Sequence, residues 1–319
     1  MRKVVGVTPT VLGILRSPAL ALSGAALFWS GNFIAGRALA GQVDPLTLNF
    51  VRWLLALVLL APFVWRSTAA HLPVLRREWQ LILALGATGL ASFHTVTYLA
   101  LQSTTATNAL LVLSLAPMTI LIGDALLGAA RLTGRQMAGA LISIVGAGVL
   151  ITRGRLDSLL ALGINVGDLW MLLGIVIWAA YSLLLRRRPA DLPPAVAMAG
   201  SAATAVALML PLWLLVAPPP TEALLALPVL LSIGYIALFA SAITFLLWVY
   251  GVARLGPSRA GQFVHLMPVF GAALAFIILG EVPTPSQLLG AALVLSGIVL
   301  VEWRGRAGFT LPPAVNVSR

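Results

Sequence analysis

The sequence predicts an all-α membrane protein with ten transmembrane helices in two inverted five-helix repeats. Three observations support this fold class: an apolar composition, an internal repeat and an alternating distribution of arginine. Of the 319 residues, 60% are hydrophobic and only 9% are charged, and the mean hydropathy is +1.03. A soluble core of this size cannot bury so much apolar surface, so the chain belongs in a lipid bilayer. The sequence contains no cysteine, which excludes disulfides and thiolate metal sites.

The second half of the chain repeats the first. A shift of about 149 residues aligns the first helices of the two halves, and a shift of about 151 residues aligns the later ones without a gap. The aligned pairs are Trp29 with Trp178, Arg37 with Arg186, Pro45 with Pro194, Ala116-Pro117 with Met267-Pro268, Thr133 with Thr284, Gln136 with Gln287, Gly139-Ala140 with Gly290-Ala291, and Gly146 with Gly297. Two such repeats in an apolar chain are typical of a transporter with a central site between its halves.

Apolar stretches of roughly 17 to 25 residues, the length that spans a bilayer, predict the ten helices. Their expected bounds are 19–39, 46–65, 79–101, 105–128, 136–152, 168–187, 194–216, 225–251, 258–280 and 286–303. Proline and glycine mark the breaks between them, for example at Pro218-Pro219-Pro220. The predicted division is a cytoplasmic lead at 1–18, a first five-helix repeat at 19–152, a second, inverted five-helix repeat at 168–303 and a disordered cytoplasmic tail at 304–319.

Basic residues alternate in step with these spans. All but four of the 20 Lys and Arg residues fall on one side of the membrane, and the exceptions are Arg37, Arg52, Arg153 and Arg155. By the positive-inside rule both termini are then cytoplasmic, and we expect a multi-pass protein of the cell inner membrane. Each repeat holds an odd number of spans, so the second must enter the membrane upside down. The loops therefore explain the net charge of +11, and no nucleic-acid partner is expected.

Sequence motifs in the two repeats resemble those of a known transporter family. The first helices carry Leu27-Phe28-Trp29-Ser30-Gly31-Asn32 and Ile177-Trp178-Ala179-Ala180-Tyr181. The second repeat then has Pro268, an apolar run and the acidic Glu281, whereas the first repeat has Ala130 in place of that acid. With ten spans in two repeats, the chain resembles the drug/metabolite transporter superfamily, and its EamA-type branch is the most similar.

That resemblance implies transport of small solutes across the membrane. Within the superfamily, the aromatic amino-acid exporters of the YddG type are similar in length, in span number and in the aromatic and histidine content of their helices. This narrower resemblance would imply export of aromatic and other apolar amino acids from the cytoplasm.

Two tryptophans are the first candidates for contact with a solute. Polar and aromatic side chains in the middle of a span usually face the bundle or a water-filled cavity. Trp29 and Asn32 share one face of the first span, and Trp178 and Tyr181 repeat that spacing in the sixth. We expect the two indoles to meet near the axis that relates the repeats and to offer flat apolar walls. The alternative is a pair of tryptophans that face lipid.

Three other spans supply polar candidates. His94 and Tyr98 form a stripe with Gln102 on the third span, and Gln262 shares a face of the ninth span with His265. Near Pro117 and Pro268 a helical hydrogen bond is missing, which frees a carbonyl at membrane depth and lets each helix bend. The predicted substrate-binding residues are Trp29, Asn32, His94, Tyr98, Ser114, Trp178, Tyr181, Gln262 and His265. His265, the counterpart of Ser114, is the strongest polar candidate; the alternative for each histidine is a structural bond to a nearby carbonyl.

The remaining charged and small residues are interpreted as structural. Arg52 with Asp44, and Asp124 with Arg131 or Arg135, lie near helix ends and are expected to be solvated or locally paired. Gly139, Ser143 and Ala147 form a stripe of small residues whose counterpart contains Gly290 and Gly297. Such stripes predict close helix packing, between repeats or between protomers.

No catalytic residue, cofactor or metal site is predicted. The sequence lacks His-Glu-x-x-His, a P-loop and Gly-x-Ser-x-Gly. Without a P-loop the chain cannot hydrolyse ATP, so we expect a secondary transporter that exports a small molecule, most plausibly a neutral or aromatic amino acid, by alternating access. The alternatives are export of drugs or other metabolites by the same fold, a channel, and a membrane-embedded enzyme acting on lipid-linked substrates, which the scattered acidic residues disfavour. We expect a monomer or a weak homodimer.

Overall fold

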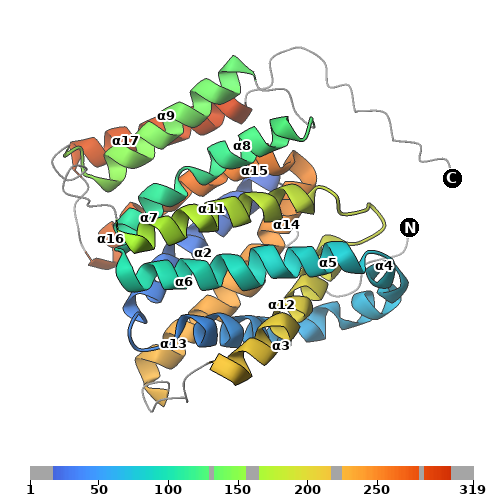
Figure 1. Ribbon diagram of the computed structural model, residues 1–319. Coiled ribbons are helices and arrows are strands. Elements are labelled where there is room, and N and C mark those ends of the chain that lie inside the picture. The colour runs from blue at the N-terminus through green and yellow to red at the C-terminus, as the bar shows by residue number, and fades with distance from the viewer. Residues whose placement is uncertain (1–16, 129–132, 156–164, 217–224, 280–283, 303–319) are drawn as a thin grey trace.

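Figure 1 shows the computed structural model, which describes residues 17–128, 133–155, 165–216, 225–279 and 284–302. Within these ranges the chain is a bundle of helices without a strand. Residues 1–16 of the predicted lead, the predicted tail 304–319, and the position of Glu281 with its counterpart Ala130 lie outside the described residues.

The helices of the first half run from Pro18 to Ile151. They are α2 (Pro18–Ala38), α3 (Pro45–Ala70), α4 (Leu72–Arg77), α5 (Trp79–Leu85), the π-helical η1 (Gly86–Ser92), α6 (Phe93–Ser103), α7 (Ala106–Leu113), α8 (Ala116–Leu126) and α9 (Gly134–Ile151). Those of the second half are α11 (Val166–Leu185), α12 (Pro194–Val216), α13 (Leu227–Tyr235), the π-helical η3 (Ile236–Ile243), α14 (Thr244–Leu255), α15 (Pro257–Gln262), the 3₁₀ turn η4 (Phe263–His265), α16 (Leu266–Leu279) and α17 (Pro285–Glu302).

This architecture confirms the predicted fold class. In the described part of the chain, 8 helical stretches are long and apolar enough to cross a membrane, and they coincide with the first eight predicted spans. Three of these are compound: α5, η1 and α6 form one stretch, α7 and α8 a second, and α13, η3 and α14 a third. The ninth predicted span is α15, η4 and α16 in succession, and the tenth is the shorter α17.

Helix irregularities recur at matching places in the two halves. The π-helical segment η1 begins at Gly86 and η3 begins at Ile236, so a shift of 150 residues superposes their starts. Pro62 lies inside α3, and Pro211 lies at the equivalent place inside α12. The duplicated unit therefore keeps its helix defects as well as its helices. Such defects often accompany functional sites, because they redirect side chains and backbone carbonyls.

The fourth span of each repeat is broken just before a proline. Pro117 has no N–H to donate to the carbonyl of Leu113, where α7 ends, and Pro268 has none for Val264, which lies in η4. Other helices use carbonyls near these breaks. The Ser30 hydroxyl donates to the Met267 carbonyl at 2.9 Å, and His265 Nε2 lies 2.7 Å from the Ser114 carbonyl.

The two fifth spans, α9 and α17, lie side by side at one edge of the bundle (Figure 1). Gly146 faces the Gly290 carbonyl, and Gly139 faces the Gly297 carbonyl, so closely that a Cβ at these glycines would meet backbone atoms. The Ser143 hydroxyl donates to the Val294 carbonyl at 3.2 Å. Of the two predicted uses of the small-residue stripe, the structure shows packing between the repeats of one chain.

The perimeter of the bundle is strongly apolar. Phe63 is 85% exposed and Leu126 is 83% exposed, and leucine and valine predominate among the other exposed side chains of the spans. Water would penalise such a surface, whereas lipid chains would not.

The local pairing expected for Arg52 is wrong, and Asp124 has partners that the sequence did not indicate. Asp44 caps α3 by accepting from the Thr47 amide at 2.9 Å, whereas Arg52 is completely buried and bonds to other helices. Asp124 pairs with Arg186 and accepts from Ser258, and Arg131 lies outside the described residues. In both cases the partner comes from a distant part of the chain, so neighbouring sequence could not identify it.

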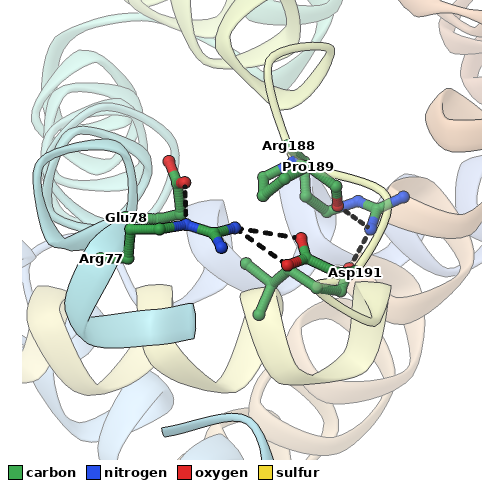
Figure 2. A network of polar contacts seen from close by, with 6 residues as sticks. Arg77, Glu78, Arg188, Pro189 and Asp191 are labelled. Carbon is green, nitrogen blue, oxygen red and sulfur yellow. Dashed lines mark hydrogen bonds and ion pairs between the residues drawn. The ribbon is translucent and has the colours of Figure 1, made fainter. Parts of the chain in front are cut away.

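One end of the bundle carries most of the described arginines, and we call it the arginine-rich end. Figure 2 shows a network there between the α4–α5 corner and the α11–α12 loop. Arg77 donates to Glu78 at 2.9 Å and to both carboxylate oxygens of Asp191, at 2.9 and 3.2 Å. These bonds raise the pKa of Arg77, and Arg188 donates to the carbonyls of Pro189 and Leu192. The network joins the two repeats outside the spans.

Candidate functional site

Aromatic rings meet at the centre of the bundle, where α2 and α11 approach each other. The Trp29 and Trp178 rings are 5.2 Å apart between centroids and nearly perpendicular, at 85°. Trp248 of α14 packs against both, at 5.4 and 5.1 Å, and Phe245 meets Trp29 edge to face at 5.6 Å. Edge-to-face geometry is favourable for aromatic pairs. The first spans of the two repeats thus contact each other through their equivalent tryptophans.

A small cavity lies beside this cluster. Its volume is about 20 Å³, which is room for about one water molecule and too little for an amino acid. Its lining residues come from both repeats: Trp29, Asn32, Phe33, Phe93, His94, Thr97, Leu113, Trp178, Val264 and Met267. Most of these side chains are apolar or aromatic, and a few are polar, which is the composition of a solute pocket.

The polar side of the cavity is formed by Asn32 and the residues behind it. The Tyr98 hydroxyl donates to Asn32 Oδ1 at 3.0 Å, and Arg52 Nη1 donates to the Tyr98 oxygen at 2.7 Å. Arg52 also donates through Nε to Ser241 Oγ at 2.8 Å and through Nη2 to the Ala240 carbonyl at 3.2 Å. The guanidinium lies 5.3 Å from the Trp53 ring centroid, within the range of a cation–π contact.

Helix α3 positions this arginine by contacting both π-helical segments. Asn49, three residues before Arg52 and so on the same face of α3, donates to the carbonyls of Leu90 at 3.0 Å and Ala91 at 2.8 Å in η1. Arg52 donates hydrogen bonds to two groups of η3, the Ser241 hydroxyl and the Ala240 carbonyl. The same carbonyl also accepts from Trp29 Nε1 at 3.2 Å. Carbonyls at these irregular segments therefore find donors within the protein, as backbone at membrane depth requires.

A second polar layer lies next to the cavity, at the breaks of the fourth spans. His265 and Gln262 are fully buried, and His265 bridges to the Ser114 carbonyl. Neither amide atom of Gln262, nor Nδ1 of His265, has a hydrogen-bond partner among the described residues. This layer shares Leu113, Val264 and Met267 with the cavity but does not open into it in the present conformation.

Polar contacts close the bundle at both ends. At the arginine-rich end, Asp124 of α8 joins Arg186, at the end of α11, to Ser258 of α15. At the opposite end, the Thr104 hydroxyl donates to Asp168 of α11 at 2.7 Å, and Arg37 donates to the Leu101 carbonyl at 2.6 Å. These contacts hold the helices together at both ends, and the cavity of about 20 Å³ can admit a solute of amino-acid size only if helices separate.

A larger cleft of about 600 Å³ lies between α2, α13 and α16, away from the centre. Its wall includes Phe28, Ile34 and Leu274. Its two hydroxyl groups are already used, since Tyr235 donates to the Phe28 carbonyl at 2.8 Å and Ser232 donates to the Pro228 carbonyl at 2.8 Å. The cleft offers a polar solute little orientation, so the central cavity is the better candidate despite its smaller volume.

The structure places the predicted site residues in three groups. Trp29, Asn32, His94 and Trp178 line the cavity. Tyr98 and Tyr181 lie directly behind it, the first bonded to Asn32 and the second packed on Trp178 with centroids 5.2 Å apart. Ser114, Gln262 and His265 form the adjacent layer.

Sequence reasoning missed Phe93, Thr97, Phe245, Trp248 and Arg52. Phe245 and Trp248 follow the same three-residue spacing as Trp29 and Asn32, so an aromatic pair in mid-span was an available signal. Among the described residues, no group of three or more His, Cys, Asp or Glu side chains is placed to hold a metal ion.

Comparison with known proteins connects this geometry to a family. A profile described as the EamA-like transporter family matches residues 16–152 and again residues 165–303. An uncharacterized transporter of Bacillus subtilis, YdeK, is 30% identical over 86% of this chain and 91% of its own length. A probable terminal-alkyne amino-acid exporter of Streptantibioticus cattleyicolor is 29% identical over 72% of this chain and 74% of its own. A solved crystal structure is similar with a TM-score of 0.71 and 25% identity, covering 89% of this chain and 96% of the other.

Proposed function

Because the chain belongs to the EamA-like transporter family, we propose that it exports neutral, mainly aromatic or apolar amino acids through the central cavity. The observation that carries this proposal is the composition of the cavity. Two equivalent tryptophans form an apolar wall, Asn32 and His94 add polar groups, and the described lining contains no Asp or Glu. A flat apolar side chain suits the indoles, whereas a polycationic drug would find no carboxylate.

Two further facts support the proposal, one concerning the solute and one concerning the orientation in the membrane. One relative is named a probable terminal-alkyne amino-acid exporter, and the match covers 72% of the present chain. Four-fifths of the basic residues lie on one side of the predicted spans, which by the positive-inside rule puts the arginine-rich end and both termini in the cytoplasm. The protein would then lie in the inner membrane as a multi-pass secondary transporter.

The contacts at the two ends of the bundle support alternating access. Opening the Asp124 contacts would admit a solute from the cytoplasm, and opening the Thr104–Asp168 contact would release it on the other side. The breaks before Pro117 and Pro268 are the places at which α8 and α16 could tilt without losing a helical hydrogen bond. Inverted repeats make the inward and outward movements equivalent by symmetry.

Purified protein in liposomes loaded with labelled phenylalanine tests the proposal. We expect faster release than from protein-free liposomes, and competition from other aromatic amino acids. Transport of cationic drugs, with no movement of or competition by amino acids, would instead identify a drug exporter of the same fold. The Trp65→Ala variant is a suitable control, because Trp65 is 70% exposed on the perimeter of α3.

A further inference from the structure

Arg52 is a buried cation without a buried anion. Its side chain is fully inaccessible, and no carboxylate of the described residues forms an ion pair with it. A guanidinium has five N–H donors, and the three hydrogen bonds of Arg52 all go to neutral oxygens. Neutral acceptors satisfy donors but do not cancel the charge. An intramembrane cation of this kind is costly, and it usually marks a functional site.

The chain of hydrogen bonds from Arg52 has a fixed direction. A guanidinium can only donate, so the Tyr98 oxygen must accept and its hydrogen must go to Asn32 Oδ1. The oxygen of the Asn32 amide is therefore turned toward Tyr98, and its Nδ2 is left to donate elsewhere. Nδ2 has no partner among the described residues and is not a fully buried atom, which fits the position of Asn32 on the cavity wall.

We propose that Arg52, acting through Tyr98, turns the Asn32 amide into a donor that holds the carboxylate of the solute. This deepens the proposed function, on which it rests, by naming the group of the solute that is recognised. The Asn32 N–H donors would bind a carboxylate oxygen directly. The guanidinium of Arg52 lies behind Asn32, with Tyr98 between them. Its positive potential favours a bound anion, because the dielectric constant of the site is low. Arg52 and Tyr98 are positioning residues, and Asn32 makes the contact.

The helix geometry fits this assignment. Asn32 lies one turn from Trp29 on α2, so an aromatic side chain against the indoles would place its backbone carboxylate near the amide. Alternatively, Arg52 has a purely structural role and only donates a hydrogen bond to the Ala240 carbonyl. That role needs a donor but no net charge. Selectivity for a charged group of the solute distinguishes the two roles.

Competition in wild-type liposomes gives the first test. The probes are phenylalanine, 3-phenylpropanoate, which keeps the carboxylate, and 2-phenylethylamine and phenylalanine amide, which lack it. We expect the two carboxylates to compete at least about tenfold better than the two compounds without one, as for loss of a hydrogen bond to a charged group. Equal competition by 2-phenylethylamine would overturn the proposal while leaving phenylalanine export intact.

Variants test the relay itself. Tyr98→Phe keeps the ring but removes the hydroxyl, and Arg52→Met keeps much of the volume but removes the charge. Each should reduce the preference for carboxylates about tenfold, and the double variant should lose little more, because both changes break one chain. Arg66→Met is the matched control, since Arg66 lies on the same helix as Arg52, α3, but is exposed. It should leave the preference unchanged.

Two outcomes separate the relay from the proposed function. If Arg52→Met does not accumulate in the membrane, Tyr98→Phe and the wild-type series still decide, and an undiminished carboxylate preference in Tyr98→Phe would overturn the relay. If phenylalanine is not transported, binding of 3-phenylpropanoate to purified protein, measured as a thermal shift, remains informative. Binding that is lost in Tyr98→Phe would support the relay and reject amino-acid export.

Discussion

At equivalent positions of the first three spans, on or behind the cavity wall, the two repeats carry different side chains, and the amide, imidazole and guanidinium groups all lie in the first repeat. A shift of 149 residues on the first two spans, and of 150 on the third, which superposes η1 on η3, gives the pairs Asn32 with Tyr181, Asn49 with Met198, Arg52 with Ser201, His94 with Thr244, and Tyr98 with Trp248. The polar side chains of the cavity lining therefore come from the first repeat, whereas both repeats contribute aromatic rings, although the two halves derive from the same duplicated unit.

Positions that shape the backbone did not diverge in this way. Pro117 and Pro268 break both fourth spans, and Thr133 with Gln136 forms a cap on α9 that Thr284 with Gln287 repeats on α17. Only the fourth span reverses the trend, because His265 in the second repeat faces Ser114 in the first. The two repeats therefore share their helix breaks and caps, and they differ in the side chains of a few positions that face the interior. At a pair that is identical in the two repeats, the same substitution should therefore have a similar effect in either repeat. At a pair that differs, only one of the two substitutions should have a large effect.

The largest expected effect comes from the one aromatic pair that did not diverge. Trp29→Ala and Trp178→Ala should each weaken solute binding by roughly 3 kcal/mol, because each removes a ring from the wall of the cavity. The measurement is the concentration of phenylalanine that half-saturates transport, at equal protein level. Trp65→Ala, on the lipid-facing perimeter, is the control. A large effect in only one of the two variants would break the symmetry of the aromatic wall.

Next in size is the packing of the fifth spans. Gly146→Ala and Gly290→Ala should each destabilise the protein by about 2 kcal/mol, because the new methyl group meets backbone atoms of the facing helix. Thermal unfolding in detergent measures this effect. Gly148→Ala, also in α9, has open space around the added Cβ and should be neutral or slightly stabilising. An equal loss of stability in Gly148→Ala would show that contact of the new methyl group with the facing helix is not the cause.

The closure at the arginine-rich end should be weaker than this packing. Asp124→Asn removes the charge that joins Arg186 to Ser258, and should favour opening at that end by about 1.5 kcal/mol. A cysteine introduced at the buried Ile120 reports the opening through its rate of labelling by a hydrophilic thiol reagent. Asp168→Asn, at the opposite end, should not accelerate labelling of that cysteine. If it did, the two closures would not be independent gates.

The smallest effect is expected from the network in Figure 2. Asp191→Asn removes the ion pair with Arg77, but both side chains are more than half exposed. Exposed ion pairs contribute less than about 1 kcal/mol and are screened by salt. Unfolding temperature and transport should both stay close to those of the wild type. A strong transport defect would instead make this junction between the repeats part of the moving mechanism.

The sequence predicted the helices well, because hydropathy and proline positions act locally. It also predicted that Trp29 and Trp178 face inward, since the repeat placed equivalent residues on one symmetry axis. It failed at Arg52 and Asp124, for which a nearby partner was expected. Their partners, Tyr98 and Ser241 for Arg52 and Arg186 and Ser258 for Asp124, are brought together only by packing of distant spans. The π-helical segments that position Ser241 have no compositional signal of their own.

Solute protection of a single cysteine tests the central claim, that the site is the central cavity lined by Trp29 and Trp178. The chain has no cysteine of its own, so Thr97→Cys would place one thiol at the cavity and Ser232→Cys one in the outer cleft. With a small, membrane-permeant alkylating reagent, phenylalanine should slow modification at position 97 and leave position 232 unaffected. Protection at position 232 alone, in protein that still transports phenylalanine, would contradict the assignment and move the site to the cleft.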